Sequence, residues 1–372
     1  MMTIDETTSR ISAILKPHEN NPRSSEGDFL RLRDGRILFA YSAYHGASWG
    51  DDEYSDIRAL YSSDNGETFS PCTEDGEPRI LISAAAYGEK NVMSVSLLRM
   101  ENGDLGLFYI LKKQEDHTDE YLLSRSRDEG ETFYETVSVL PGDWKGYYVI
   151  NNARVERMSD GRLVVPAAHH DVSQRADGYG YDGRSNVVFY CSDDDGHTWF
   201  RLRSRLDMPA LNGCNTGLQE PGVIELPNGD WYAYMRTDRG YQYEALSPDR
   251  GEHWFGPQPS AFSAPASPME LVKNPYSGKY YAVWNPIPNY NGRHDPNGAV
   301  WGRTPLAIAE SADGYNYDFG HIQYIEDDPA RGYCYPALFF ADEHTLLAAY
   351  CSGGGGEEAG CLQRLTIRRI RL

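Results

Sequence analysis

A short turn motif recurs along the chain and constrains its fold more than any other feature. A Ser is followed two residues later by Asp and two residues further by Gly, and full copies continue into an aromatic residue. The copies are found at 62–69, 126–133, 192–199, 247–254 and, in degenerate form, 311–315. The Ser and Asp side chains can bond the amides of a turn, Gly supplies a positive φ, and the aromatic ring packs beneath the hairpin. The motif therefore predicts structural turns, and its acids are not expected to be catalytic.

A second series of turns precedes apolar or alternating segments and sets the length of the repeat. Its markers are Gly35, Gly103, Gly161, Gly229, Gly278 and, in place of a sixth glycine, His344. Neighbouring markers are 49 to 68 residues apart, which accommodates four short strands and their turns, the size of one propeller blade. The alternating segment 362–372 is expected to complete a blade begun near the N-terminus, since ring closure hides sheet edges. The sequence thus predicts an all-β, six-bladed β-propeller in a single domain, 1–372.

The composition agrees with a chain of short strands and limits the partners. Aromatic residues make up 12% and apolar residues 40% of the chain, as suits β-strands. The formal net charge of -20 repels nucleic acid and anionic membrane surfaces, so neither is expected as a partner. An anionic substrate would have to be held by a local cluster of arginines.

The cysteines and the N-terminus carry further expectations. The six cysteines are scattered, without a Cys-x-x-Cys pair or the His spacing of a zinc site, so free thiols and no metal or cofactor are expected. The N-terminus lacks a basic segment followed by an apolar run, and no later stretch approaches the ~20 apolar residues of a membrane span. These features predict a cytoplasmic protein.

Polar residues near predicted strand starts mark the candidate site. The innermost strands of a propeller direct side chains from distant segments into one funnel. The segments that stand out are 21–28, 219–226 with 234–237, 302–306 and 332–338. Within them, Glu220 is followed sixteen residues later by an Arg, a further Arg precedes the last repeated turn, and a Tyr-x-x-Leu follows that turn.

Together with the five repeated turns, known as Asp boxes, this pattern resembles the bacterial sialidases (neuraminidases) over the whole chain. In that family three arginines hold the carboxylate of the substrate, a Tyr paired with a Glu is the nucleophile, and a loop Asp is the acid/base. The resemblance implies that Arg23, Arg236 and Arg303 bind the carboxylate. It implies Tyr335 and Glu220 as the nucleophilic pair.

The resemblance also implies an acid/base ahead of the first Asp box, in the acidic segment 50–56. We favour Asp51 for this role, with Asp52 as the close alternative and otherwise a substrate contact. Gln242 is a further candidate for substrate binding, within a stacking wall formed with Tyr243, segment 284–285 and Trp301, because aromatic faces suit sugar rings.

The residue types suit a carboxylated sugar on physical grounds. Guanidinium groups stay charged and form forked hydrogen bonds with a carboxylate, so three together can desolvate an anion. A sialic acid carries its carboxylate on the anomeric carbon, where a carboxylate nucleophile would be repelled and a neutral tyrosine is not. The first site departs from the family, since Arg23 is followed by Ser-Ser where members typically have Ile-Pro. Substrate contacts near Arg23 can therefore differ from those of the family.

Three functions are compatible with this pattern. The first is a retaining exo-sialidase that releases a terminal sialic acid or a related 2-keto acid sugar. The second is another carbohydrate-active enzyme, a hydrolase or lyase, acting on uronate-containing glycans. The third is a non-catalytic glycan-binding propeller, which the presence of Tyr335, Glu220 and an acid at 51–52 disfavours. The pattern favours the first function and leaves the linkage and the oligomeric state open.

Overall fold

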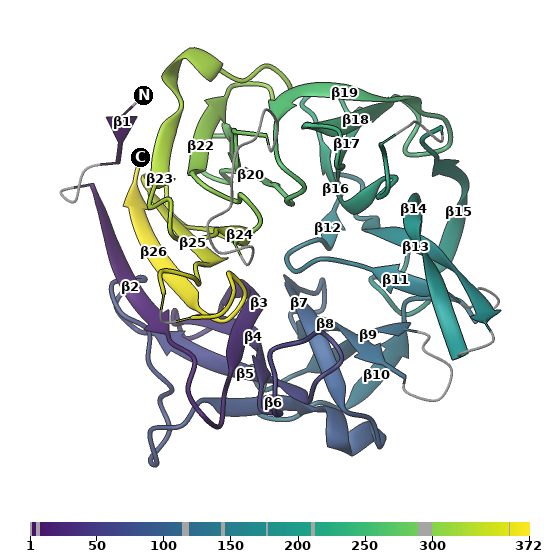
Figure 1. The fold of residues 1–372 in the computed structure, drawn as a ribbon. Helices are drawn as coiled ribbons and strands as arrows, with labels where there is room; N and C mark the ends of the chain where they lie inside the picture. The colour runs from purple at the N-terminus through teal and green to yellow at the C-terminus, as the bar shows by residue number, and fades with distance from the viewer. Residues whose placement is uncertain are drawn as a thin grey trace.

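The computed structural model describes residues 2–4, 8–113, 119–142, 146–175, 178–209, 213–288, 300–356 and 358–372. Within these ranges the chain forms mainly antiparallel β-strands, arranged like propeller blades around a central axis (Figure 1). The helical elements of the described chain are two short 3-10 helices, η1 (Ala84–Tyr87) and η2 (Phe319–His321). No helix in these ranges is long and apolar enough to cross a membrane. The predicted all-β class and propeller arrangement are confirmed.

Hydrogen bonds join the described strands into five sheets. The largest contains β3 (Arg23–Arg31), β4 (Ile37–Tyr44), β5 (Ser55–Ser62), β6 (Arg79–Ser83), β7 (Asn91–Arg99), β8 (Leu105–Lys112), β9 (Asp119–Ser126) and β10 (Glu135–Ser138). The next contains β11 (Tyr147–Val149), β12 (Glu156–Arg157), β13 (Leu163–Arg175), β14 (Gly178–Ser192) and β15 (Phe200–Leu206). A third contains β16 (Gln219–Glu225), β17 (Trp231–Arg236), β18 (Tyr241–Ser247) and β19 (Phe255–Ser263).

The two remaining sheets lie at the C-terminal side of the ring. One contains β20 (Glu270–Lys273), β21 (Tyr280–Trp284), β22 (Leu306–Ser311), β23 (Gln323–Glu326) and the short β1 (Met2–Thr3). The other contains β24 (Cys334–Asp342), β25 (Thr345–Cys351), β26 (Leu365–Arg371) and β2 (Ser9–Leu15). Strand β2 from the N-terminal end pairs antiparallel with β26 from the C-terminal end, side by side in Figure 1. The predicted pairing of the two chain ends is therefore confirmed.

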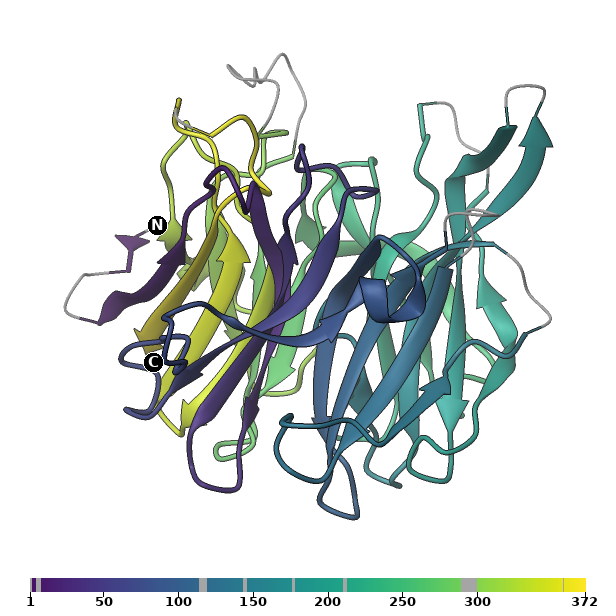
Figure 2. The same ribbon diagram turned by 90° about the horizontal axis from the view of Figure 1, so that it is seen from below.

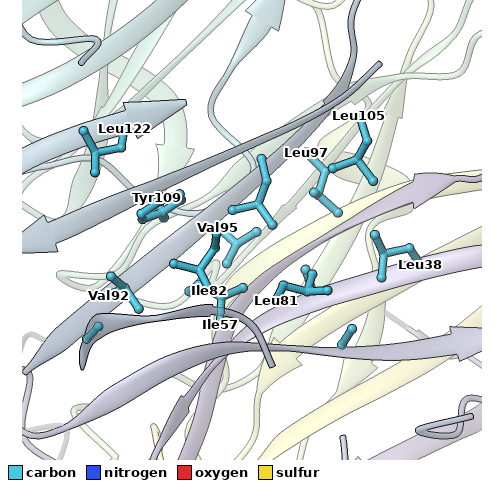
Figure 3. Close-up of a cluster of buried hydrophobic side chains, with 14 of the residues drawn as sticks. Leu38, Ile57, Leu81, Ile82, Val92, Val95, Leu97, Leu105, Tyr109 and Leu122 are labelled. Atoms are coloured by element: carbon cyan, nitrogen blue, oxygen red, sulfur yellow. The ribbon is translucent and has the colours of Figure 1, made fainter. Parts of the chain in front are cut away.

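The eight-stranded sheet is made of two antiparallel units, β3 to β6 and β7 to β10. A parallel bridge between Ser55 and Asn91 links the two units. The sequence predicts six sheet units, and the described chain has five hydrogen-bonded sheets, because this bridge merges two units into one sheet. Apolar side chains fill the space between these two units, among them Leu38, Val95 and Leu105 (Figure 3).

The repeated turns have the hydrogen bonds that their residue types predict. In the first copy, Gly66 N–H donates to Ser62 Oγ over 2.8 Å and Thr68 N–H donates to Asp64 Oδ1 over 3.0 Å. Gly66 has φ 83°, a conformation that glycine adopts without strain. The same Ser and Asp contacts recur in the later full copies. The acids of these turns are thus engaged by their own backbone.

Candidate functional site

Four inner strands carry the same irregularity at the end that faces the site. In β3, β7, β16 and β24 the pairing register shifts where one extra residue is inserted, at Glu26, Ser94, Glu220 and Tyr335 respectively. Each of these residues has a positive φ, between 47° and 60°, which is strained for a residue with a side chain. Such β-bulges redirect side chains. All four side chains line one cavity.

The cavity has a volume of about 560 Å³ and is lined by residues of the inner strands β3, β7, β16 and β24. Figure 2 shows the strands running along the axis, with loops gathered at the two ends. The described residues that line the cavity are Glu26, Asp51, Met93, Ser94, Ile110, Lys112, Tyr147, Tyr148, Val149, Asn151, His170, Gln219, Glu220, Arg236, Ala266, Trp301, Arg303, Tyr335 and Leu362. Acids, cations and aromatic rings thus meet in one open cavity of the size typical for small-molecule sites.

Tyr335, Glu220 and Arg236 form a hydrogen-bonded chain in this cavity. The Tyr335 hydroxyl donates to Glu220 Oε1 over 2.8 Å, and Arg236 Nη1 donates to the same oxygen over 2.7 Å. Burial raises the pKa of Tyr335, and the negative charge of Glu220 raises it further. Tyr335 is therefore a neutral hydroxyl with a carboxylate positioned to accept its proton.

Arg303 lies beside this hydrogen-bonded group of three residues and is buried, with 3% of its surface exposed. Its guanidinium lies 4.6 Å from the centre of the Trp301 ring and 5.6 Å from that of Tyr335. Its Nη2 donates to the carbonyl of Ala266 over 3.2 Å. Its Nε and Nη1 are buried and donate to no oxygen of the described chain, and its charge belongs to the cavity lining.

Arg23 is placed differently from the other two predicted arginines. It is 1% exposed and is not among the residues that line the cavity. Its Nη2 donates to Glu26 Oε2 over 2.7 Å and its Nη1 to Asp51 Oδ1 over 2.5 Å. Glu26 and Asp51 do line the cavity. Arg23 therefore lies behind two carboxyl groups and acts on the cavity through them.

The acidic loop contributes one of its two candidate residues to the cavity. Asp51 lines it, and burial acts to raise the pKa of this carboxyl, but the charges of Arg23 and Lys112 outweigh burial and lower it. The Asp52 side chain is 98% exposed, 3.7 Å from Lys112 Nζ, and is not part of the lining. Both neighbouring acids are thus exposed, but Asp51, whose side chain is 53% exposed, lines the cavity and bonds Arg23, whereas Asp52 does not line the cavity.

Gln242 and most of the proposed stacking wall lie outside the cavity. Gln242 is buried and its Nε2 donates to the carbonyl of Ser267 over 2.7 Å. Tyr243 and Trp284 belong to two apolar cores. Of this predicted group, Trp301 lines the cavity. Its φ of 51° is a further strained position at the site.

Several lining residues were not among the predicted site residues. Glu26 and Ser94 project from β-bulges, which periodicity does not reveal, and the sequence signal for Glu26 was the unusual segment after Arg23. Lys112 is the last residue of β8, and its Nζ lies 5.0 Å from the centre of the Tyr147 ring. Lys112 could have been identified from the sequence as a charged residue at the end of an otherwise apolar strand.

The sequence matches the family of BNR repeat-like domains over residues 75–347. It is 26% identical over 231 residues to an anhydrosialidase of the leech Macrobdella decora, an alignment that covers 59% of this chain and 28% of the relative. The chain therefore spans less than a third of that relative's length.

Solved structures of sialidases share the fold. A Streptococcus pneumoniae NanB sialidase aligns with a TM-score of 0.67 at 14% identity, covering 98% of this chain and 70% of the other. The Trypanosoma rangeli sialidase in complex with 2,3-difluorosialic acid, a covalent intermediate, has a TM-score of 0.67 at 16% identity, with coverages of 99% and 60%. A protein of unknown function from Dyadobacter fermentans gives 0.69 at 16% identity, with coverages of 98% and 100%. This chain belongs to the BNR repeat-like domain family.

Proposed function

We propose that this protein is a glycoside hydrolase, a retaining exo-sialidase that releases a terminal sialic acid or a related 2-keto acid sugar. The observation that carries the proposal is the chain of hydrogen bonds from Tyr335 to Glu220 to Arg236 inside one cavity. A tyrosine whose proton can pass to a neighbouring carboxylate is an activated nucleophile. A binding surface has no need of that arrangement.

The carboxylate of the substrate is bound by Arg236 and Arg303. Both line the cavity, and each retains at least one guanidinium nitrogen that no oxygen of the described chain accepts from. Guanidinium forks match the two oxygens of a carboxylate. Held in this way, the anomeric carbon lies next to Tyr335, which the Arg303 guanidinium approaches to 5.6 Å. The buried Arg23 assists by holding Glu26 and Asp51 in place.

The reaction proceeds in two displacements. In the first, Tyr335 Oη bonds to the anomeric carbon while its proton passes to Glu220, the glycosidic bond breaks, and the leaving oxygen takes the proton of Asp51. In the second, water attacks the same carbon, Asp51 takes its proton, and the bond to Tyr335 breaks as the phenolate regains its proton from Glu220. Two inversions at one carbon retain its configuration.

We also propose that the chain forms one domain, 1–372, with six blades. The two antiparallel units of the eight-stranded sheet would each count as a blade, and their single parallel bridge supports that division. The pairing of β2 with β26 supports closure of the ring within the same chain.

A second candidate is a hydrolase or lyase for uronate-containing glycans. It is favoured by the engagement of Arg23 with Glu26 and Asp51, which leaves two arginines rather than three in the lining. A uronate bears its carboxylate away from the anomeric carbon and needs less charge beside the nucleophile.

The test compares a fluorogenic sialoside with a fluorogenic glucuronide. The proposal predicts turnover of the sialoside alone, abolished in Tyr335→Phe and retained in Tyr333→Phe, a matched change at a tyrosine of an apolar core. Turnover of the glucuronide alone would establish the second candidate. Turnover of the sialoside by Tyr335→Phe at the wild-type rate would contradict the assigned nucleophile.

A further inference from the structure

Arg23 directly bonds two carboxyl groups of the cavity lining. Its two terminal nitrogens are divided between them, Nη2 to Glu26 and Nη1 to Asp51. Its Nε donates to Ser25 Oγ over 2.8 Å, and its Nη1 also donates to the carbonyl of Trp49 over 3.1 Å. The guanidinium lies 4.3 Å from the centre of the Tyr44 ring. Arg23 is therefore held in one position, and its positive charge is shared between Glu26 and Asp51.

Arg23 is the cation that acts most strongly on Glu26, and two serine hydroxyls also bond it. Ser25 Oγ donates to its Oε2 over 3.1 Å and Ser94 Oγ donates to its Oε1 over 3.3 Å. The negative charges of Asp51 and Glu220 also act on it and raise its pKa. With 4% of its surface exposed, Glu26 is costly to ionise next to an ionised Asp51.

Asp51 faces a more favourable set of charges. Besides Arg23, the cations that act on it are Lys112, from β8, and Arg303, from the segment before β22. Burial raises the pKa of Glu26, whereas the cations around Asp51 lower that of Asp51. Two carboxyl groups that compete for one cation and interact this closely titrate as a pair. Their environments therefore bias the shared proton toward Glu26, and the state of the pair in which Glu26 is ionised and the proton is on Asp51 is the one that can act as general acid.

We propose that Glu26 is a positioning residue for the acid/base: it shares Arg23 with Asp51, and the two carboxyl groups hold one proton between them, so each sets the protonation state of the other. The role of Asp51 in this statement rests on the proposed function. The coupling itself does not, because it follows from the contacts with Arg23 in the free protein. An ionised Glu26 keeps a proton on Asp51 to a higher pH, where the general acid needs it.

The coupling is measured without any substrate, by titrating the side-chain carboxyl carbons in ¹³C NMR spectra of the whole chain. In Asp51→Asn, Glu26 loses its acidic neighbour and has Arg23 to itself, so its midpoint should fall by about one pH unit or more. In Glu26→Gln, Asp51 should lose the step at higher pH in which it shares a proton with Glu26, and should titrate with a single midpoint at the lower pH. Glu53→Gln, a charge change in the same loop, should leave both midpoints in place. Independent titration of Glu26 in wild type and Asp51→Asn would overturn the proposal.

The pH profile of kcat/KM on a sialoside then tests the consequence for catalysis. Glu26→Gln should move the basic limb to lower pH, and Glu26→Asp, which restores the charge, should return it toward the wild-type position. A structural role would lower kcat/KM equally at every pH, and that result would contradict the positioning role. If the two carboxyl groups titrate together but no sialoside is turned over, the proposed function is wrong and the coupling of Glu26 with Asp51 stands. If the sialoside is turned over but the two groups titrate independently, the coupling is wrong and the proposed function stands.

Discussion

Tyr335 and Glu220 lie 115 residues apart in the sequence, and the tyrosine hydroxyl donates a hydrogen bond of 2.8 Å to the glutamate. Each occupies the extra position of a β-bulge in an inner strand, with φ of 53° and 47°. The strain of these positions is borne by the surrounding sheets. The pair is therefore preorganised by the backbones of two different sheets, which fixes its geometry before a substrate arrives.

Removing the charge of Glu220 should disable the nucleophile while preserving the shape of the cavity. We expect Glu220→Gln to lower kcat by about 10²–10⁴-fold, because the amide does not take the proton of Tyr335. Steady-state kinetics on a sialoside check this. Glu225→Gln, in the same strand but bonded to Ser159 instead, serves as the control. A Glu220→Gln enzyme as active as that control would remove Glu220 from the mechanism.

Replacing Arg303 with lysine should weaken binding of the substrate carboxylate. A lysine keeps the charge but loses the planar fork, so we expect binding of free sialic acid to weaken by roughly 10- to 100-fold. Isothermal titration calorimetry measures the change. Arg162→Lys, at an arginine that pairs with Asp193 instead, should bind as wild type. Equal affinity in the two variants would show that Arg303 does not hold the carboxylate.

The sequence anticipated features that depend on local chemistry. The repeated turns were readable because Ser62, Asp64 and Gly66 bond one another within five residues. The pairing of β2 with β26 followed from the alternation of the last strand and the need to cover its edge.

Features that depend on strand register or loop conformation could not be predicted from the sequence. The β-bulge that aims Glu26 into the cavity leaves no periodic signal. Gln242 is turned toward the carbonyl of Ser267, because side chains alternate along β18. The loop directs Asp51 to Arg23 and Asp52 toward solvent. The number of hydrogen-bonded sheets depended on one bridge, at Ser55.

Asp28 should make stability depend on pH. Burial raises its pKa from 3.8 to about 7, although the backbone amides of Leu97 and Phe29 donate to it. The folded state holds this proton more tightly than the unfolded state does. The contribution of Asp28 to the free energy of unfolding is therefore complete below the unfolded pKa and is lost as pH rises to about 7. The melting temperature of Asp28→Asn, relative to that of wild type, should therefore rise between pH 4 and pH 7. A constant difference across that range would contradict the assignment.

The Asp of a repeated turn should affect stability and leave activity alone. Asp194 accepts from Ser192 Oγ and from the backbone and hydroxyl of Thr198, so Asp194→Ala should lower the melting temperature by a few degrees. Its kcat on a sialoside should match that of wild type, because the turn is not part of the cavity lining. A loss of kcat with unchanged melting would indicate a direct role of Asp194 in the reaction.

The most direct test of the account is to trap the intermediate on Tyr335. The protein is incubated with 2,3-difluorosialic acid, and its intact mass and peptides are measured by mass spectrometry. We expect one sugar to be bound covalently to the peptide that contains Tyr335, and no adduct in Tyr335→Phe. An unchanged mass, or an adduct on another residue, would contradict a tyrosine nucleophile in this cavity.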